Sequence, residues 1–355
     1  MPRPLTVLAL LPLLAAAATA QPRAPFSVGP ITAQPGSRVS GSLEVAAHAG
    51  DEGTTIPVTV VHGNTPGPVL ALVAGTHGYE YTPILAAQRL RTSVDPATLA
   101  GTLVIVHAAN MPSLFGRTIY YSPVDGKNLN RVFPGRADGT VSERIADVIT
   151  REIIDRATHV IDMHCGDGNE SLRPYLYWIA TGPVDVARAS YDMALAAGFS
   201  HIVIDRDRPT DAASSIYLSN TAILRGKPAL TIESGELGQS DDESTTRIVE
   251  SMMGVMRHLG MRADGPLPVA HPVWIGQNEV VRAGTTGLVR PFVERGTTVA
   301  QGALLARIVD VFGDPIEELR APFDGEVLYI LGTPPVSNGE PVAFIGARTD
   351  APARP

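Results

Sequence analysis

Residues 69–80 read VLALVAGTHGYE, and the fold that we expect follows from this stretch. Its first six residues form an unbroken apolar run, which is typical of a strand that is covered on both faces of a sheet. Its last six residues form a glycine-flanked turn that carries His77 and Glu80. The stretch therefore predicts a buried strand that delivers two polar side chains at its carboxyl end.

Two later apolar runs end in the same manner. Residues 159–163 lead into His164, and residues 228–232 lead into Glu233. Predicted strands alternate with predicted helices through this part of the chain, which indicates a mixed, mostly parallel α/β sheet flanked by helices. Open α/β sheets bind ligands at the carboxyl ends of their strands. We therefore expect His77, His164 and Glu233 to converge at one sheet edge.

Other parts of the chain predict further elements around this core. Thr140 and Glu143 fit a capping box, which predicts a helix that runs from there to about residue 156. Residues 111–136 form a long polar stretch, which we interpret as a loop, and loops of that length are usually functional. The remaining expected elements are strands at 38–45, 56–61, 102–107 and 202–204 and helices at 82–90, 184–197 and 241–259.

His77, Glu80 and His164 together offer two imidazole nitrogens and one carboxylate. Three such ligands, with the fourth position left for water, make an open catalytic zinc site, which is the kind that a hydrolase needs. The structural alternatives are that His77 is a loop histidine, that Glu80 is a surface glutamate and that His164 is a core histidine. All three residues are expected at one edge of the sheet, which favours a site for one Zn²⁺ per chain. Asp162 precedes His164 by two residues on the same strand face, so it either orients that ligand or is a structural carboxylate.

Catalytic and substrate-binding roles are predicted for four more residues. Glu233 is expected to act as the general base, with Glu236 as the competing candidate and a helix-capping or salt-bridged carboxylate as the structural alternative. In the long loop, Arg131 is expected to hold a substrate carboxylate with help from Asn130, unless Arg131 only binds main-chain carbonyls. Arg117 is expected to polarise the scissile carbonyl and to stabilise its oxyanion, unless it is merely solvated.

The last part of the chain contains an internal repeat. The pair Arg282-Ala283 recurs 38 residues later as Arg320-Ala321, and Ile308 recurs 37 residues later as Ile345. Short halves with matching glycines predict a quasi-two-fold all-β domain that resembles the barrel-sandwich hybrid of biotinyl and lipoyl carriers. A carrier needs an acceptor lysine, and the only lysines lie far upstream, at 127 and 227. We therefore expect a structural lid or an oligomerisation module.

The first twenty residues predict a secretory signal peptide. Arg3 provides a positive start, residues 5–18 are apolar, and residues 18–20 (ATA) form a cleavage site, so the mature chain would begin at Gln21. An uncleaved anchor is the alternative, but the segment is short for a membrane span. We expect a soluble, exported, periplasmic protein with no stable membrane insertion after cleavage. The single cysteine, Cys165, allows no internal disulfide and is expected to be a buried structural thiol.

These observations divide the chain into four parts. They are a signal peptide (1–20), an N-terminal extension with edge strands (21–54), a hydrolase domain (55–265) and a C-terminal β domain (266–350). The net charge of −8 argues against nucleic acid as a partner, because that role needs a basic face. The sequence leaves open whether the chain forms a homo-oligomer.

The ordered motifs resemble the succinylglutamate desuccinylase/aspartoacylase family, a branch of the zinc carboxypeptidase fold. The motifs are HGYE at 77–80, NR at 130–131, DMH at 162–164 and TIE at 231–233. The resemblance implies zinc held by the two histidines and the first glutamate, the last glutamate as the base, and the arginine on the substrate carboxylate. The chain differs from the family in having Asn128 in place of the aspartate of the Asp-Leu-Asn-Arg motif.

We therefore expect a zinc-dependent amidohydrolase that cleaves the amide bond of N-acyl amino acids or related small carboxylate substrates. One alternative is an exported zinc carboxypeptidase that acts on short peptides or cell-wall fragments. Another is a non-catalytic binding protein on the same scaffold. A serine esterase is disfavoured because the sequence lacks a Gly-x-Ser-x-Gly elbow.

Overall fold

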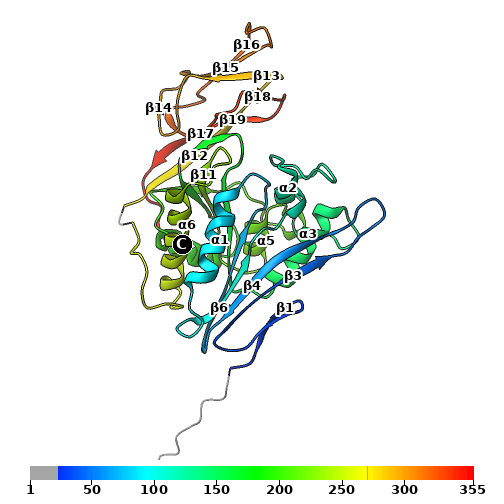
Figure 1. Cartoon of the computed structure of the whole chain (residues 1–355). Coiled ribbons are helices and arrows are strands. Elements are labelled where there is room, and N and C mark those ends of the chain that lie inside the picture. Colours follow the sequence, from blue (N-terminus) through cyan, green and yellow to red (C-terminus); the bar gives the residue numbers. More distant parts are fainter. Residues whose placement is uncertain (1–22, 270) are drawn as a thin grey trace, which may run out of the picture.

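A computed structural model describes residues 23–269 and 271–355 (Figure 1). The predicted signal peptide therefore lies outside the described residues. The helices are α1 (Tyr81–Ser93), α2 (Met111–Gly116), α3 (Val141–Ile149), α4 (Val184–Ala196), α5 (Leu218–Leu224) and α6 (Asp242–His258), with short turns η1 (Leu129–Arg131), η2 (Thr150–Ile154) and η3 (Ala212–Ser214).

Nineteen strands accompany them in the described residues. Those before α6 are β1 (Phe26–Val28), β2 (Ile31–Ala33), β3 (Ser37–Val45), β4 (Thr54–His62), β5 (Thr65–Ala74), β6 (Ala100–Val106), β7 (His159–Gly166), β8 (Glu170–Leu172), β9 (Tyr175–Ile179), β10 (His201–Asp205) and β11 (Ala229–Glu236). Those after it are β12 (Val273–Arg282), β13 (Gly287–Pro291), β14 (Thr298–Val299), β15 (Leu304–Val309), β16 (Pro315–Arg320), β17 (Gly325–Leu331), β18 (Pro335–Val336) and β19 (Pro341–Thr349).

One large mixed sheet forms the core of the molecule. Its strand order is β14-β17-β19-β12-β10-β9-β11-β7-β5-β6-β4-β3, and β8 pairs with β17. From β12 to β6 the neighbouring strands are parallel except for β9 and β11, while both edges are antiparallel. The mixed sheet with a largely parallel centre confirms the predicted fold class.

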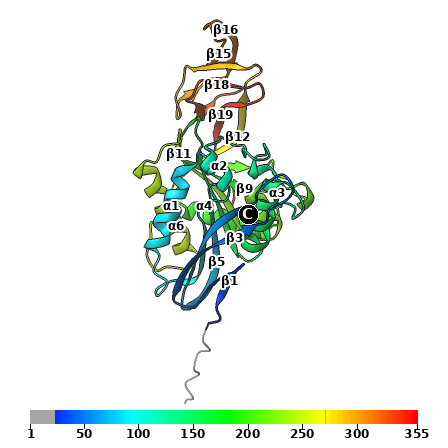
Figure 2. The same cartoon turned by 45° about the vertical axis from the view of Figure 1, so that its right-hand side comes forward.

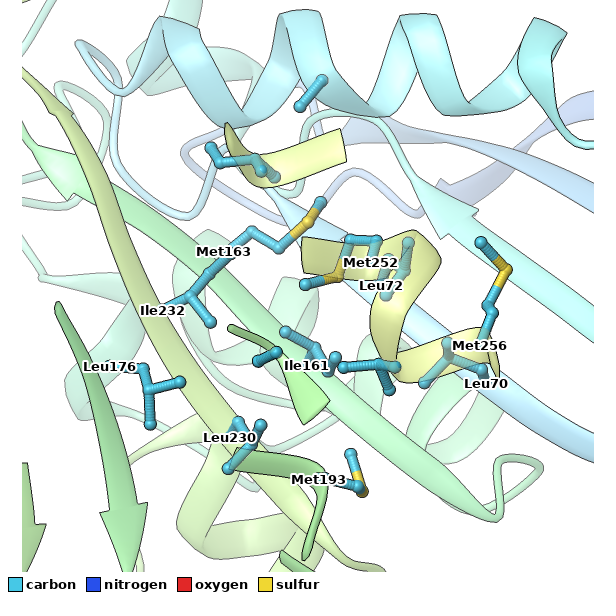
Figure 3. Close-up of a cluster of buried hydrophobic side chains, with 14 of the residues drawn as sticks. Leu70, Leu72, Ile161, Met163, Leu176, Met193, Leu230, Ile232, Met252 and Met256 are labelled. Carbon is cyan, nitrogen blue, oxygen red and sulfur yellow. The ribbon is translucent and has the colours of Figure 1, made fainter. Parts of the chain in front are cut away.

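The strand β5 shows why the centre of the sheet is apolar on both faces. Successive side chains point to opposite faces of a strand, so Leu70 and Leu72 enter one buried cluster while Ala71 and Val73 enter another. Figure 3 shows the first cluster, in which the β5 leucines lie with Met163 of β7 and with methionines of α6. Residues of α1, α4 and α6 complete this face, and residues of α3 and α5 complete the other.

The region between β6 and β7 is only partly as predicted. The capping box is present, because the backbone N–H of Thr140 donates to Glu143 Oε2 at 2.8 Å. The predicted loop at 111–136 is wrong at its start, where α2 begins after Asn110 and the Asn110 side chain accepts a hydrogen bond from the backbone of Ser113. Such a short helix is stabilised by its cap and its surroundings rather than by a periodic apolar pattern.

The C-terminal strands have the predicted two-fold arrangement. β13 pairs with β15 and β18, and in the second half β17 pairs with β19 and β14. Likewise, β15 pairs with β16 and β19 pairs with β12, so each strand contact has a counterpart one repeat later. Figures 1 and 2 show these strands projecting beyond the α/β body. The boundary at residue 265 stays a prediction, because β12 also continues the large sheet.

Two further findings concern expected properties of the chain. Among the helices of residues 23–269 and 271–355, none is long and apolar enough to cross a membrane. Cys165 is buried, as expected, and burial raises the pKa of its thiol well above the ordinary value, which keeps it protonated.

Candidate active site

The strand register brings the predicted site residues together. In the parallel pair of β7 and β11, His164 lies directly beside Glu233. In the parallel pair of β5 and β7, Ala74 at the end of β5 lies beside Met163, so the turn after β5 meets the end of β7. The three strands end at one edge, as expected for parallel neighbours, and they deliver the histidines and the carboxylates to one place.

His77, Glu80 and His164 form a compact buried cluster. His77 Nδ1 lies 2.7 Å from Glu80 Oε1, and His164 Nδ1 lies 2.9 Å from Glu80 Oε2. One donor atom from each of the three residues lies within 4.8 Å of the others. All three side chains are almost completely buried, so the cluster could hold a cation and is not a group of exposed acids.

The proton on the His77 ring can be located from its neighbours. Asn128 Oδ1 accepts a hydrogen bond from the backbone N–H of Asn130 at 2.8 Å, which fixes the orientation of the Asn128 amide. The same oxygen lies 3.1 Å from His77 Nε2, so Nε2 carries the proton and donates it. His77 Nδ1 then faces Glu80 Oε1, and a cation held between the two residues would take the Nδ1 lone pair.

His164 is held in the same tautomer by a second pair of groups. Asn130 Oδ1 accepts from the backbone N–H of Leu218 at 2.9 Å, so its Nδ2 points to Asp162 Oδ2 at 3.2 Å. Asp162 Oδ2 also lies 3.0 Å from His164 Nε2, which therefore donates to it. This contact places Asp162 where it can orient the His164 ring, whose Nδ1 faces Glu80.

These residues fit a zinc ion. Two imidazole Nδ1 lone pairs and one carboxylate match the donor set of open catalytic zinc sites, and each imidazole is held from behind by an oxygen acceptor, as metal-binding histidines usually are. Burial alone would raise the pKa of Glu80, but the two imidazoles that face it lower that pKa to about 2. Glu80 is therefore ionised and ready to bind a cation.

Replacing Asn128 with alanine is expected to weaken zinc binding by about 10- to 100-fold, which is the usual cost of losing such a supporting group. The substitution removes the acceptor for His77 Nε2–H and thus frees the ring and its tautomer. Competition with a chromophoric chelator would measure the affinity. Asn278→Ala is the control, because it removes an amide from β12 that does not line the cavity, and the zinc affinity should stay unchanged. An unchanged zinc affinity in Asn128→Ala would contradict the role assigned to Asn128.

Glu233 faces the cluster with an unused carboxylate oxygen. Its Oε2 is buried and has no hydrogen-bond partner among the described residues. Burial raises the pKa of Glu233 well above its usual range, and the nearby His164 opposes this shift. The competing candidate, Glu236, is engaged elsewhere, since its carboxylate binds Ser171, the backbone of Leu172 and Arg295.

A cavity of about 580 Å³ opens over the cluster and Glu233. Six tyrosines line it, namely Tyr120, Tyr121, Tyr175, Tyr177, Tyr217 and Tyr329. Its cationic residues are Lys127, Arg131, Arg208 and Arg282. Four of the lining residues come from the C-terminal strands β12, β17 and β19, so these strands form part of the cavity wall; they are Val280, Arg282, Tyr329 and Pro341.

The predicted substrate-binding residues have different surroundings. Arg131 lies in the cavity wall with its guanidinium carbon 4.6 Å from the centre of the Tyr217 ring, and Arg208 lies 3.7 Å from the same centre. One nitrogen of Arg131 donates to the carbonyl of Asn130. Asn130 also lies in the cavity wall, and both ends of its amide bind within the protein, to Asp162 and to the backbone of Leu218.

Arg117 is not brought to the cavity. It is exposed at the C-terminal end of α2, where it adopts a left-handed backbone conformation with φ 50°. It is absent from the residues that line the cavity. The structure therefore gives no support to Arg117 as the group that stabilises the oxyanion.

Comparisons of the chain with known proteins identify its family. The profile of the succinylglutamate desuccinylase/aspartoacylase catalytic domain matches residues 66–259. The N-alpha-acetyl-L-2,4-diaminobutyric acid deacetylase of Halomonas elongata is 31% identical over 299 residues, which cover 82% of this chain and 85% of that protein. The chain belongs to the succinylglutamate desuccinylase/aspartoacylase family.

Solved structures of family members have the same overall fold. The product-bound ectoine utilization protein EutE (DoeB) of Ruegeria pomeroyi is 27% identical with a TM-score of 0.77, and the match covers 93% of this chain and 100% of that one. The succinylglutamate desuccinylase/aspartoacylase of Rhodobacter sphaeroides is 25% identical with a TM-score of 0.78, and the match covers 94% and 100%. Family membership supports amide hydrolysis of N-acyl amino acids as the class of activity.

Several cavity residues of this family member were not predicted from its sequence. Tyr175 and Tyr177 lie on β9, where the unbroken aromatic and apolar run of residues 175–179 is a strand signal. Glu170 follows His164 by six residues and enters the cavity from β8. Tyr329 reaches the cavity from the C-terminal domain, and the local sequence pattern does not predict such a contact.

Proposed function

We propose that this protein is a zinc-dependent amidohydrolase that removes the acyl group from N-acyl amino acids. The observation that carries the proposal is the buried cluster of His77, Glu80 and His164, which faces the unpaired carboxylate of Glu233 inside one cavity. His77, Glu80 and His164 would hold the zinc ion. When bound, zinc would polarise the amide carbonyl and make water more acidic.

Glu233 performs the proton transfers in this proposal. Its free oxygen accepts a proton from the attacking water and then donates that proton to the departing nitrogen. The new C–O bond forms first, when water adds to the carbonyl carbon, and the C–N bond breaks afterwards, as the nitrogen receives the proton, so the products are a carboxylic acid and a free amine. The strand pairing that holds Glu233 beside His164 keeps the carboxylate at the reacting carbon.

Arg131 binds the substrate carboxylate in this proposal. A guanidinium pairs with a carboxylate through two parallel N–H groups, and only one nitrogen of Arg131 donates to the protein among the described residues. The ring of Tyr217 supports Arg131 and Arg208, so the carboxylate would meet a preformed cationic surface. The deacetylase of Halomonas elongata suggests an acetylated amino acid as the first substrate to test.

The test is a hydrolysis assay of the chain from Gln21 with N-acetyl amino acids, including N-alpha-acetyl-L-2,4-diaminobutyric acid, and with short peptides. Zinc-loaded protein should release free amino acid, and chelated protein should release almost none. Substrates whose carboxylate is blocked as a carboxamide should be hydrolysed at least about ten-fold less efficiently, because they cannot pair with a guanidinium. Cleavage of peptides alone would instead support a carboxypeptidase. Zinc binding without any hydrolysis would support a binding protein. Either of these two results would overturn the proposal.

A further inference from the structure

Glu170 is an acidic group of the cavity that the proposed reaction does not use. It lies on β8, is 9% exposed and belongs to the cavity wall. Its side chain has one hydrogen-bond partner among the described residues, the hydroxyl of Tyr120, at 2.5 Å from Oε1. It forms no ion pair with an arginine, lysine or histidine of residues 23–269 and 271–355, although a buried carboxylate usually has such a partner.

Three tyrosines share the cavity wall with this carboxylate. Burial raises the pKa of Tyr120, Tyr175 and Tyr329 well above the usual value, and the charge of Glu170 adds to the shift at each hydroxyl. All three tyrosines line the cavity. The Tyr120 ring also packs edge-on against His77 with the ring centres 5.8 Å apart. Glu170 therefore lies one aromatic ring away from the metal cluster.

The basic side chains of the cavity lie in other surroundings. Arg131 and Arg208 share the ring of Tyr217, and Lys127 pairs with Glu143 at 3.0 Å. Arg282 donates to the carbonyl of Gly339 and forms no ion pair with Glu170. Burial, helped by the charges of Asp167 and Glu80, raises the pKa of Glu170 to about 7 against the opposing hydrogen bond from Tyr120 and the opposing charge of His77. The cavity thus has a cationic region beside Tyr217 and a separate anionic region at Glu170.

We propose that Glu170 binds a primary ammonium group of the substrate, so that the enzyme selects N-acyl amino acids that carry an ammonium in addition to a carboxylate. A carboxylate gives the ammonium an ion pair, and the neighbouring tyrosine rings attract it through their faces. This inference rests on the proposed function and names the substrate class of the same site. The ammonium can belong to the side chain of the amino acid or to the acyl group.

The alternative is that Glu170 only anchors Tyr120. A structural anchor affects every substrate in the same way, whereas an ammonium site changes the ratio between a cationic substrate and a neutral one of equal shape. Substrate pairs that differ only in NH₃⁺ against CH₃ therefore separate the two roles.

The experiment uses two such pairs with zinc-loaded protein. Nα-acetyl-L-ornithine against Nα-acetyl-L-norleucine places the ammonium on the amino acid, and γ-aminobutyryl-L-leucine against pentanoyl-L-leucine places it on the acyl group. In one of the pairs, kcat/KM should be about 10- to 100-fold higher for the cationic member. In Glu170→Gln, which keeps an acceptor for Tyr120, that ratio should fall to within about three-fold of unity.

Controls separate the failure of this inference from that of the proposed function. Glu250→Gln removes a charge from the exposed side of α6 and should preserve the ratio. Calorimetry with the four cleavage products alone, ornithine, norleucine, γ-aminobutyrate and pentanoate, measures the preference without turnover. If no substrate is hydrolysed but a cationic product still binds at least ten-fold more tightly than its neutral partner, only the proposed function fails. Equal efficiency and equal binding in both pairs, or a ratio that Glu170→Gln does not change, would overturn the ammonium site.

Discussion

Replacing Glu233 with glutamine is expected to lower kcat by about 100- to 10,000-fold, which is the range that a positioned general acid–base contributes. Glutamine keeps the size and the hydrogen-bonding shape of the side chain, but its amide accepts no proton from water and returns none to the leaving nitrogen. The carboxylate has no partner to lose, because its buried Oε2 is unpaired among the described residues. The substitution therefore removes the proton carrier and leaves the surrounding structure in place.

Two measurements isolate this effect from metal loss. Metal analysis of the purified variant should still find one zinc ion per chain, since the expected ligands are unchanged. Glu236→Gln is the matched control, because Glu236 lies three residues further along the same strand and is held by Ser171 and Arg295 outside the cavity. Its turnover should stay within about three-fold of the parent value. Undiminished turnover in Glu233→Gln would contradict its role as the base.

The core of the site could be predicted because its signals are local. His77, Glu80, His164 and Glu233 each follow an apolar run, and parallel strands bring their carboxyl ends to one edge whatever the details of packing. The family resemblance drew on these same residues, and the family comparison agrees with it. Asp162 was also predictable as a neighbour of His164, because alternate residues of a strand share a face.

The remainder of the site depends on long-range contacts that have no local signal. Arg117 is only a few residues from Tyr120, yet the end of α2 turns it to solvent while Tyr120 enters the cavity. Asn130 lines the cavity, as a substrate-binding residue would, but its amide also holds Asp162 and the start of α5, and these partners have no local signal. Glu170 reaches the cavity because β8 pairs with β17, two strands that are far apart in the sequence.

For the C-terminal domain, the sequence predicts the internal arrangement of the strands but not their contacts with the rest of the protein. Its repeat predicted a two-fold sandwich, and the reciprocal strand pairings confirm it. A repeat describes only the internal symmetry of the domain. It does not say which face meets the body of the protein, so the contribution of Tyr329 and Arg282 to the cavity could not be deduced from it.

Glu326 joins that domain to the body of the protein, and Glu326→Gln is expected to destabilise the fold by about 3 kcal/mol at neutral pH. Glu326 of β17 is 1% exposed. Its carboxylate lies 2.7 Å from Arg173, which follows β8, and 2.8 Å from Arg348 of β19, and His201 of β10 lies 3.5 Å away. Burial would raise the pKa of Glu326, but these three groups outweigh it and lower that pKa from 4.5 to about 2. Each tenfold change in proton affinity corresponds to about 1.4 kcal/mol, which gives the expected loss.

The sign of the pH dependence makes this prediction specific. Because folding lowers the pKa of Glu326, its stabilising contribution is present above pH 4.5 and is lost as the pH falls towards 2. Urea unfolding of chelated protein should show the full difference between parent and Glu326→Gln at pH 7 and a much smaller one at pH 3. Glu318→Gln, on the exposed strand β16, is the control and should leave the unfolding midpoint unchanged, since ion pairs at the surface contribute little. A difference that persists undiminished at low pH would mean that packing, rather than the ionised carboxylate, holds the C-terminal domain against the body of the enzyme.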